Sequence, residues 1–229
     1  MVNGMTKRDI EKQLNKTIMN KLPEGFAAKG QLLFHTPIEW FIRGYGFHWS
    51  EYDKDKFRVI AFISPLYVPE TGYYYSLHQS IGFLCYKQET WWSKFDDPQI
   101  IDCILAKGER WVGEITTPYE FAVKAKQIAL KQEIVPDDMT LSRDIAYSYL
   151  LAGRQREAIA VLKDMKFELK SRIDKGTLSC WYGDLYEEVT SMEKVAEDES
   201  MACELLQNYR DKRLNMLKMK SFAVHFQQS

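Results

Sequence analysis

The chain lacks the long apolar runs that enter or cross membranes. Of its 229 residues 45% are hydrophobic, yet its longest purely apolar stretches, such as Val59 to Ile63, fall far short of the roughly 20 residues that a membrane-spanning helix needs. The first residues pass directly into a charged helical pattern, so the apolar core of a signal peptide is missing there. We therefore expect a cytoplasmic protein with no membrane contact.

An excess of charge of one sign is also lacking. The 31 lysine and arginine residues nearly balance the 32 aspartate and glutamate residues, which leaves a net charge of −1. Neither sign forms a run that would dominate the surface field. Nucleic acid stacked on exposed aromatic rings would need a basic groove beside them, and the local charge supplies none. We expect no nucleic-acid partner.

Cysteine and histidine are scarce and scattered. The four cysteines form no C-x-x-C pair and lie far apart, so we expect free thiols rather than a disulfide framework. No two histidines have the spacing that would present both to one metal ion. We therefore expect no metal site. The residues concerned are Cys85, Cys103, Cys180 and Cys203, and His35, His48, His78 and His225.

The common catalytic and nucleotide-binding motifs are missing as well. No G-x-G-x-x-G follows a strand-like segment, and neither G-x-x-x-x-G-K-[ST] nor G-x-S-x-G occurs. Gly44-Tyr45-Gly46 is too short to hold a phosphate. We expect no cofactor, and the absences weigh against an enzyme.

Aromatic residues are abundant, and they gather in the first half. Thr6, with Asp9 three residues later, predicts the start of a helix whose apolar residues recur every four positions up to Leu22. Between Phe26 and Trp92 the apolar period changes to two, and 18 of the chain's 31 aromatic residues lie there. This pattern predicts a β-sheet.

The spacing of turns predicts four strands in an antiparallel meander. We place them at residues 31–36, 38–49, 57–63 and 73–85, with the third strand buried on both faces. The apolar phase of the second strand shifts at Gly44 and Gly46, which predicts a β-bulge or sharp bend.

The second half has a helical period. Asp97-Pro98 predicts a helix that runs to Gly108, and Thr117-Pro118-Tyr119-Glu120 predicts the start of another. No Gly/Ser-rich linker separates the halves. We therefore predict an α+β fold, in which residues 1–95 form an antiparallel meander packed on a helix and residues 96–229 form a C-terminal helical bundle, the two packed as one body.

Residues 143–166 carry the most specific local pattern, Ile145-Ala146-x-x-Tyr149-Leu150-x-x-Gly153-x-x-x-x-Ala158-Ile159-x-x-Leu162. It resembles a single tetratricopeptide-type helical hairpin. The pattern lacks the closing proline of that family, since Lys170 stands near its place, and it has no clear second copy. An ordinary helical hairpin and a degenerate repeat array both remain open. The first half resembles small bacterial domains of unknown function, in which a helix leads through Gly25-Phe26 into a meander.

Large amphipathic side chains are the best candidates for a recognition surface, because such rings dominate binding hot spots. We expect the Tyr-rich strand, the loop around Pro65 to Gly72 and the tryptophan pair to provide it. The candidate binding residues are Tyr67, Tyr74, His78, Trp91 and Trp92.

These features favour a non-catalytic protein-binding or inhibitor protein, such as a bacterial toxin-immunity or phage counter-defence protein. Self-association through the last helix is a further possibility. The alternative is a small hydrolase or transferase with a site near His35, His48 and His78. Convergence of those imidazoles with a carboxylate in one pocket would favour that alternative.

Overall fold

A computed structural model describes residues 6–53, 55–70, 72, 74–131, 139–176 and 181–224. Its contacts divide the chain into two compact units. Unit 1 consists of Met1–Pro65, Tyr73–Glu114 and Lys218–Ser229, and unit 2 consists of Leu66–Gly72 and Ile115–Leu217. Residues 96–114 thus belong with the sheet, whereas the boundary predicted at residue 95 groups them with the later helices.

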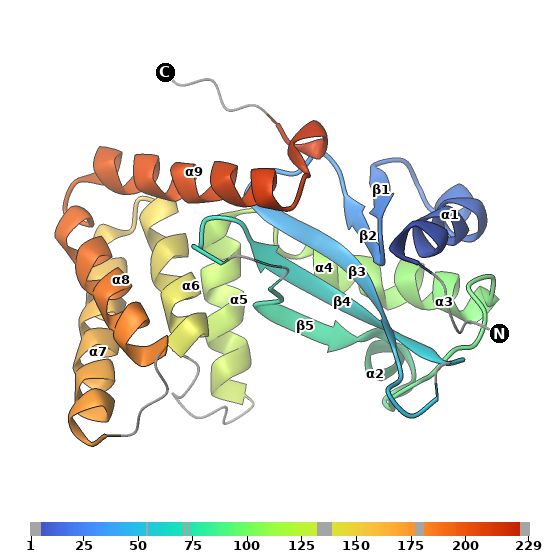
Figure 1. Ribbon diagram of the computed structural model, residues 1–229, viewed down its shortest axis with the longest axis horizontal. Coiled ribbons are helices and arrows are strands. Elements are labelled where there is room, and N and C mark those ends of the chain that lie inside the picture. The colour runs from blue at the N-terminus through green and yellow to red at the C-terminus, as the bar shows by residue number, and fades with distance from the viewer. Residues whose placement is uncertain are drawn as a thin grey trace. The chain divides into compact units, whose positions relative to one another are not determined.

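Unit 1 contains a five-stranded antiparallel sheet in the order β1-β2-β3-β4-β5 (Figure 1). Each strand pairs with the next one along the chain, so the predicted meander is confirmed. The strands are β1 (Phe26–Lys29), β2 (Leu32–His35), β3 (Phe41–Trp49), β4 (Phe57–Pro65) and β5 (Leu77–Ser80).

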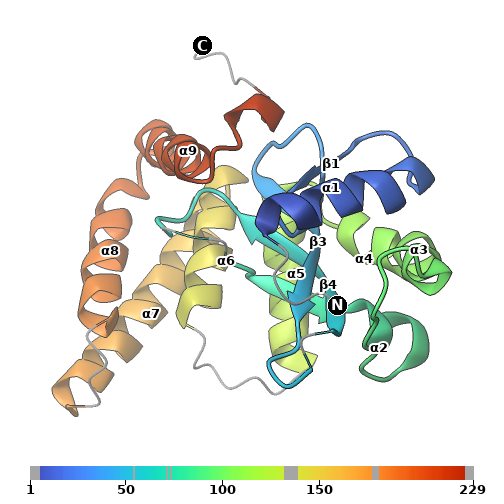
Figure 2. The same cartoon turned by 45° about the vertical axis from the view of Figure 1, so that its right-hand side comes forward.

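Helices cover one face of this sheet. Figure 2 shows α1 to α4 on the same side of the strands. The predicted cap of α1 is confirmed, because Thr6 accepts a hydrogen bond from the Asp9 amide and Asp9 bonds back to Thr6. The helical segments are α1 (Lys7–Thr17), η1 (Met19–Lys21), α2 (Ile81–Tyr86), α3 (Pro98–Cys103), η2 (Ile104–Gly108), α4 (Glu109–Gly113) and η3 (Lys220–Phe222).

The core of unit 1 lies between these helices and the odd-numbered residues of β3 and β4. Ile10, Leu14 and Ile18, the four-spaced stripe of the first helix, are buried in it. Alternation along a strand places every second side chain on this face, and several aromatic residues of the first half lie there. The sheet contributes Tyr45, Phe47, Phe57, Val59 and Ala61.

The predicted bulge at Gly44 and Gly46 is wrong. β3 pairs with β4 residue for residue from Phe41 to Trp49, and with β2 without an extra residue. The glycines serve close packing instead. A Cβ on Gly44 would lie 2.1 Å from the carbonyl oxygen of Leu33, and one on Gly46 would lie 2.9 Å from the Tyr75 hydroxyl. Gly44 therefore excludes a side chain because its Cβ would meet backbone atoms, whereas a Cβ on Gly46 would require the ends of the His48 and Tyr75 side chains to shift.

The predicted fourth strand is far shorter than residues 73–85. Within that segment only Leu77–Ser80, the strand β5, pairs with β4, and α2 begins directly after Ser80. Ile81, Leu84 and Cys85 have helical spacing and all pack against the core, so a helix buries them together, whereas a strand would split them between two faces. The sequence of this segment is compatible with both strand and helix periods, and packing against the core favours the helix.

The helix predicted from Pro98 does not stop at Gly108. It continues through the π-helical turn η2 into α4, which ends at Gly113. Asp97 caps its start as expected, by accepting a hydrogen bond from the Gln99 amide. Gly108 lies inside this helical run rather than at its end, and a Cβ there would lie 2.8 Å from the Tyr45 hydroxyl, so a side chain at this position would have to displace the Tyr45 ring.

Unit 2 is helical, and its helices are α5 (Pro118–Lys131), α6 (Met139–Leu151), α7 (Gln155–Asp174), α8 (Trp181–Val195) and α9 (Glu199–Met216). In Figure 1 helices α5 to α8 stand side by side and α9 crosses one end of the group. Thr117 and Glu120 form the predicted reciprocal cap of α5. None of the helices in the described ranges is both long and apolar enough to cross a membrane.

Helices α6 and α7 meet at Gly153, whose φ of 68° is the left-handed conformation that glycine adopts without strain. Ala146 and Ala158 are fully buried, which lets neighbouring helices approach closely. The resemblance of this hairpin to a tetratricopeptide unit stays a prediction.

Candidate functional site

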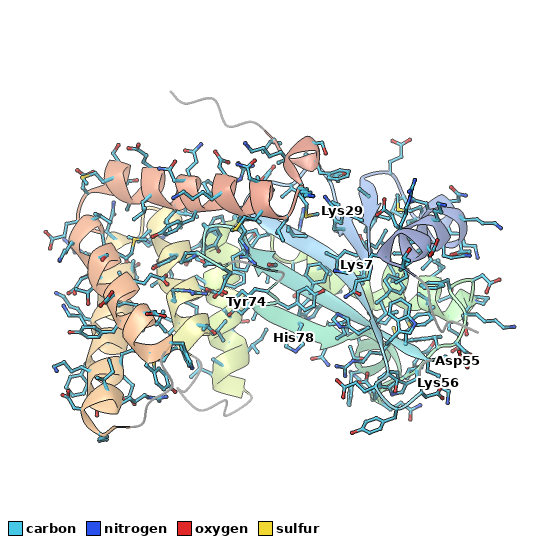
Figure 3. The ribbon with its side chains drawn as sticks, viewed as in Figure 1. Lys7, Lys29, Asp55, Lys56, Tyr74 and His78 are labelled. Carbon is cyan, nitrogen blue, oxygen red and sulfur yellow. The ribbon has the colours of Figure 1, made fainter. Side chains whose placement is uncertain are left out.

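Two of the predicted binding residues lie at the β5 edge of unit 1. His78 is exposed on β5, and Tyr74 is half-buried just before that strand. Figure 3 shows both at this edge, whereas Lys7 and Lys29 lie toward β1 and Asp55 and Lys56 lie at the turn between β3 and β4. Tyr73 lies outside the described residues. Tyr74 and His78 therefore lie at the same edge of the sheet.

The two tryptophans, Trp91 and Trp92, lie in different environments. Trp92 is buried, and its backbone N–H and carbonyl form two hydrogen bonds with the backbone of Phe57 at the start of β4. Trp91 is 41% exposed, with the Arg58 guanidinium 5.8 Å from its ring centroid. Trp91 is therefore accessible, whereas Trp92 is a core residue and the expectation that it binds a partner fails.

The prediction that Tyr67 lies in an exposed loop is also wrong. Leu66, Tyr67 and Val68 are fully buried in unit 2, because apolar side chains occupy three successive positions there. The Tyr67 hydroxyl lies 2.6 Å from the Ser148 hydroxyl on α6, and burial raises the pKa of Tyr67 well above its ordinary value. Tyr67 therefore packs the interior and does not present a binding surface.

The histidines do not converge on one pocket. His48 lies on β3 beside Arg58 and His78, its ring 5.6 Å from that of Tyr75. Burial lowers the pKa of His48, and the charges of Arg58 and His78 lower it further. The His48 Nε2 atom is buried and has no hydrogen-bond partner within the described ranges. His225 lies outside those ranges.

His35 instead belongs to a cluster around Glu109, the first residue of α4. Its Nε2 atom lies 3.3 Å from Glu109 Oε1, and the Tyr45 hydroxyl donates to the same oxygen at 2.6 Å. Burial acts to raise the pKa of Glu109, but the close approach of His35 and the hydrogen bond from Tyr45 outweigh it, and the pKa lies below its ordinary value. An ionised carboxylate thus links α4 to β2 and β3. Neither His48 nor His78 is part of this Glu109 cluster.

A second ionic cluster is buried in unit 2 around Arg143 of α6. Its Nη2 atom lies 3.0 Å from Glu70 Oε1 and 3.1 Å from Asp144 Oδ1, and Nη1 lies 3.7 Å from Glu188 Oε2. The Tyr147 hydroxyl donates to Glu188 Oε1 at 2.6 Å. Burial raises the pKa of Glu188, although Arg143 and Tyr147 act to lower it. This cluster attaches residues 66–72 to α6 and α8.

The surface of unit 2 carries an apolar groove of about 750 Å³ between α5, α6 and α7. Leu130 at its edge is 82% exposed, and Phe167 on α7 is 78% exposed. Folding leaves these two side chains in water, although each would contribute about 1.5–3 kcal/mol if it were buried. The large apolar residues that line this apolar groove are Leu130, Met139, Ile145, Val161, Met165 and Phe167, and its charged lining residues are Lys126, Asp164 and Glu168.

A second groove, of about 720 Å³, lies on the other side of Phe167 between α7 and α8. Four lysines line this lysine groove together with two acidic residues. Phe167 borders both grooves and so forms the ridge between them. The charged lining residues are Lys163, Lys166, Lys170, Lys175, Asp174 and Glu193.

Sequence patterns did not indicate the Phe167 ridge. Phe167 and Leu130 stand off the buried faces of their helices, and a single apolar residue on a polar face is common on surfaces. The available signal was the run from Lys163 to Lys170, where phenylalanine is placed among lysines and carboxylates.

The described residues contain no group of three or more His, Cys, Asp or Glu side chains placed to hold a metal ion. Comparison of the chain with protein-family models, with curated proteins and with solved structures gives no match.

Proposed function

We propose that the chain is a non-catalytic protein-binding protein, which holds a segment of its partner in the apolar groove against Phe167. One observation carries the proposal: Phe167 and Leu130 remain 78% and 82% exposed at the edges of a groove of about 750 Å³. Exposed apolar surface of this kind marks interaction sites, and aromatic side chains supply much of their binding energy. The groove volume is also within the range of ordinary ligand sites.

The distribution of aromatic residues supports this surface over the Tyr-rich strand. Tyr67 and Trp92 are buried, and Trp91 already lies against Arg58. Phe167 has no ring or cation contact of that kind with any described residue. A partner that covers Phe167 therefore displaces water alone, which is the favourable part of apolar association.

The separation of the histidines favours binding over catalysis. His35 lies against Glu109, whereas His48 lies beside His78 and Arg58. A general acid–base site needs such groups within hydrogen-bond reach of one reacting atom. An inhibitor that covers the active surface of a toxin or defence protein is one form of the proposed binding function, and it needs no reactive group of its own.

Site-specific photo-crosslinking tests the proposal. Benzoylphenylalanine is placed at position 167 of the full chain and, as a control, at position 52, where Tyr52 is a 99% exposed aromatic residue of unit 1. In extract of the native host we expect a stoichiometric protein adduct at 167, none at 52, and loss of the adduct when excess unmodified protein competes. Equal labelling at both positions, or no stoichiometric adduct at 167, would refute the proposal.

A further inference from the structure

Charge divides across the Phe167 ridge. Lys163 and Lys170, four residues before it and three after it, line the lysine groove, whereas Asp164 and Glu168 line the apolar groove together with one lysine, Lys126. Residues three and four apart lie on one helical face, so the sequence order around Phe167 produces this division. The lysine groove holds four lysines against two carboxylates, which leaves it net positive.

Two of the lysines are not neutralised locally. Lys166 pairs with Glu193 at 2.7 Å and Lys170 pairs with Asp174 at 3.1 Å. Lys163 and Lys175 form no ion pair with any residue in the described part of the chain. They lie on either side of Phe167, Lys163 within α7 and Lys175 at the C-cap of that helix, separated by about 18 Å along the helix axis.

We propose that the partner segment is acidic and carries a large apolar side chain. The inference rests on the proposed binding function and specifies its ligand. The apolar side chain enters the apolar groove beside Phe167, and carboxylates of the same segment approach Lys163 and Lys175. Complementary charge selects partners and speeds association more than it adds affinity. In an extended segment about five or six residues span the distance between the two lysines.

The same surface is unfavourable for nucleic acid. Asp164, Glu168, Asp174 and Glu193 line the two grooves together with the lysines. A continuous phosphate backbone would meet these carboxylates along its path, and nucleic-acid binding relies on an uninterrupted basic track. A peptide can place its carboxylates only where the lysines stand.

The test selects from a displayed library of random 12-residue peptides against the full chain. We expect enriched peptides to combine an aromatic or large aliphatic residue with two or more Asp or Glu residues. Phe167→Ser should weaken their binding at least tenfold, because a central aromatic contact is lost. Lys163→Glu with Lys175→Glu should weaken it several-fold, and salt should reduce the difference. Lys194→Glu is the matched control, because it reverses the charge of an exposed lysine on α8 that does not line the groove. It should change binding less than about twofold.

The outcomes separate the inference from the proposed function. Binders that require Phe167 but show no acidic preference and tolerate both lysine reversals would overturn the acidic partner and leave the binding function standing. No binder that depends on Phe167 would overturn both. Lysine-dependent binding of a single-stranded oligonucleotide tighter than that of the selected peptides would also overturn the inference. Unchanged circular dichroism of each variant shows that its fold is intact.

Discussion

Replacing Arg143 with leucine should destabilise unit 2 by about 3–5 kcal/mol, the usual cost of removing one partner from a buried ion pair. Arg143 is 3% exposed, and three carboxylates surround its guanidinium group. Asp144 is fully buried, so it cannot recover hydration when the arginine is gone. Because whole domains are stable by only about 5–15 kcal/mol, the loss should be easily measured.

The cost should also depend on pH. Burial raises the pKa of Glu188, so the folded state holds that proton more tightly than the unfolded chain does. Such a group favours folding below its unfolded-state pKa, and this contribution is lost as the pH rises through the folded-state pKa. Arg143 lowers the pKa of Glu188, and its removal raises that pKa further. The penalty of Arg143→Leu should therefore be largest near pH 8 and smaller near pH 5.

Hydrogen exchange of α6 and α8 peptides, followed by mass spectrometry, measures this penalty within unit 2 without assuming a single unfolding transition. Arg154→Leu is the matched control on the same hairpin. Its ion pair with Glu157 is exposed, so the change should cost less than about 1 kcal/mol. Arg143→Lys keeps the positive charge but loses the planar guanidinium group with its several N–H donors. Its loss of stability should therefore lie between those of Arg143→Leu and Arg154→Leu. Equal effects of the Arg143 and Arg154 changes, or a penalty that does not vary between pH 5 and pH 8, would refute the electrostatic reasoning.

Two further predictions concern unit 1. Gly44→Ala should lower the free energy of unfolding by about 1–3 kcal/mol in urea titrations, because the new Cβ would lie 2.1 Å from the Leu33 carbonyl oxygen. Gly113→Ala is the control, and it should be neutral or stabilising because no atom lies within 4 Å of the Cβ position. Equal effects would contradict the tight fit at Gly44. Burial raises the pKa of Cys85 to about 12, so iodoacetamide at pH 8 should alkylate that thiol at least about a hundred times more slowly in the folded protein than in urea. Comparable rates, measured by peptide mass spectrometry, would show that the thiol is not held neutral.

Local signals predicted most of the secondary structure. The capping pairs Thr6 with Asp9 and Thr117 with Glu120 are local in sequence and form as expected. The period-two apolar pattern predicted the antiparallel sheet, in which each strand pairs with the next one along the chain. Where the pattern was compatible with two periods, as at Ile81, the sequence could not choose. Packing of the later residues of that segment favoured a helix.

The buried polar contacts of unit 2 were harder to predict because their partners are distant in sequence. Glu70 and Arg143 are separated by 73 positions, and Tyr67 and Ser148 by 81. No local pattern distinguishes a loop tyrosine that reaches the interior from one that faces water. Phe167 shows the reverse case, since phenylalanine is usually buried, whereas this side chain lies off the buried face of α7 and is exposed.

Residues 66–72 follow β4 in the chain, yet they supply unit 2 with polar partners that its own helices lack. Glu70 pairs with Arg143, and the Gly72 carbonyl accepts a hydrogen bond from Arg213 Nη2 at 2.9 Å. A fragment of residues 115–217 keeps both arginines but loses both of these partners. Unit 1 likewise has three separate stretches of sequence, so no single cut yields either unit whole. The full chain is therefore the form in which the Phe167 surface must be tested.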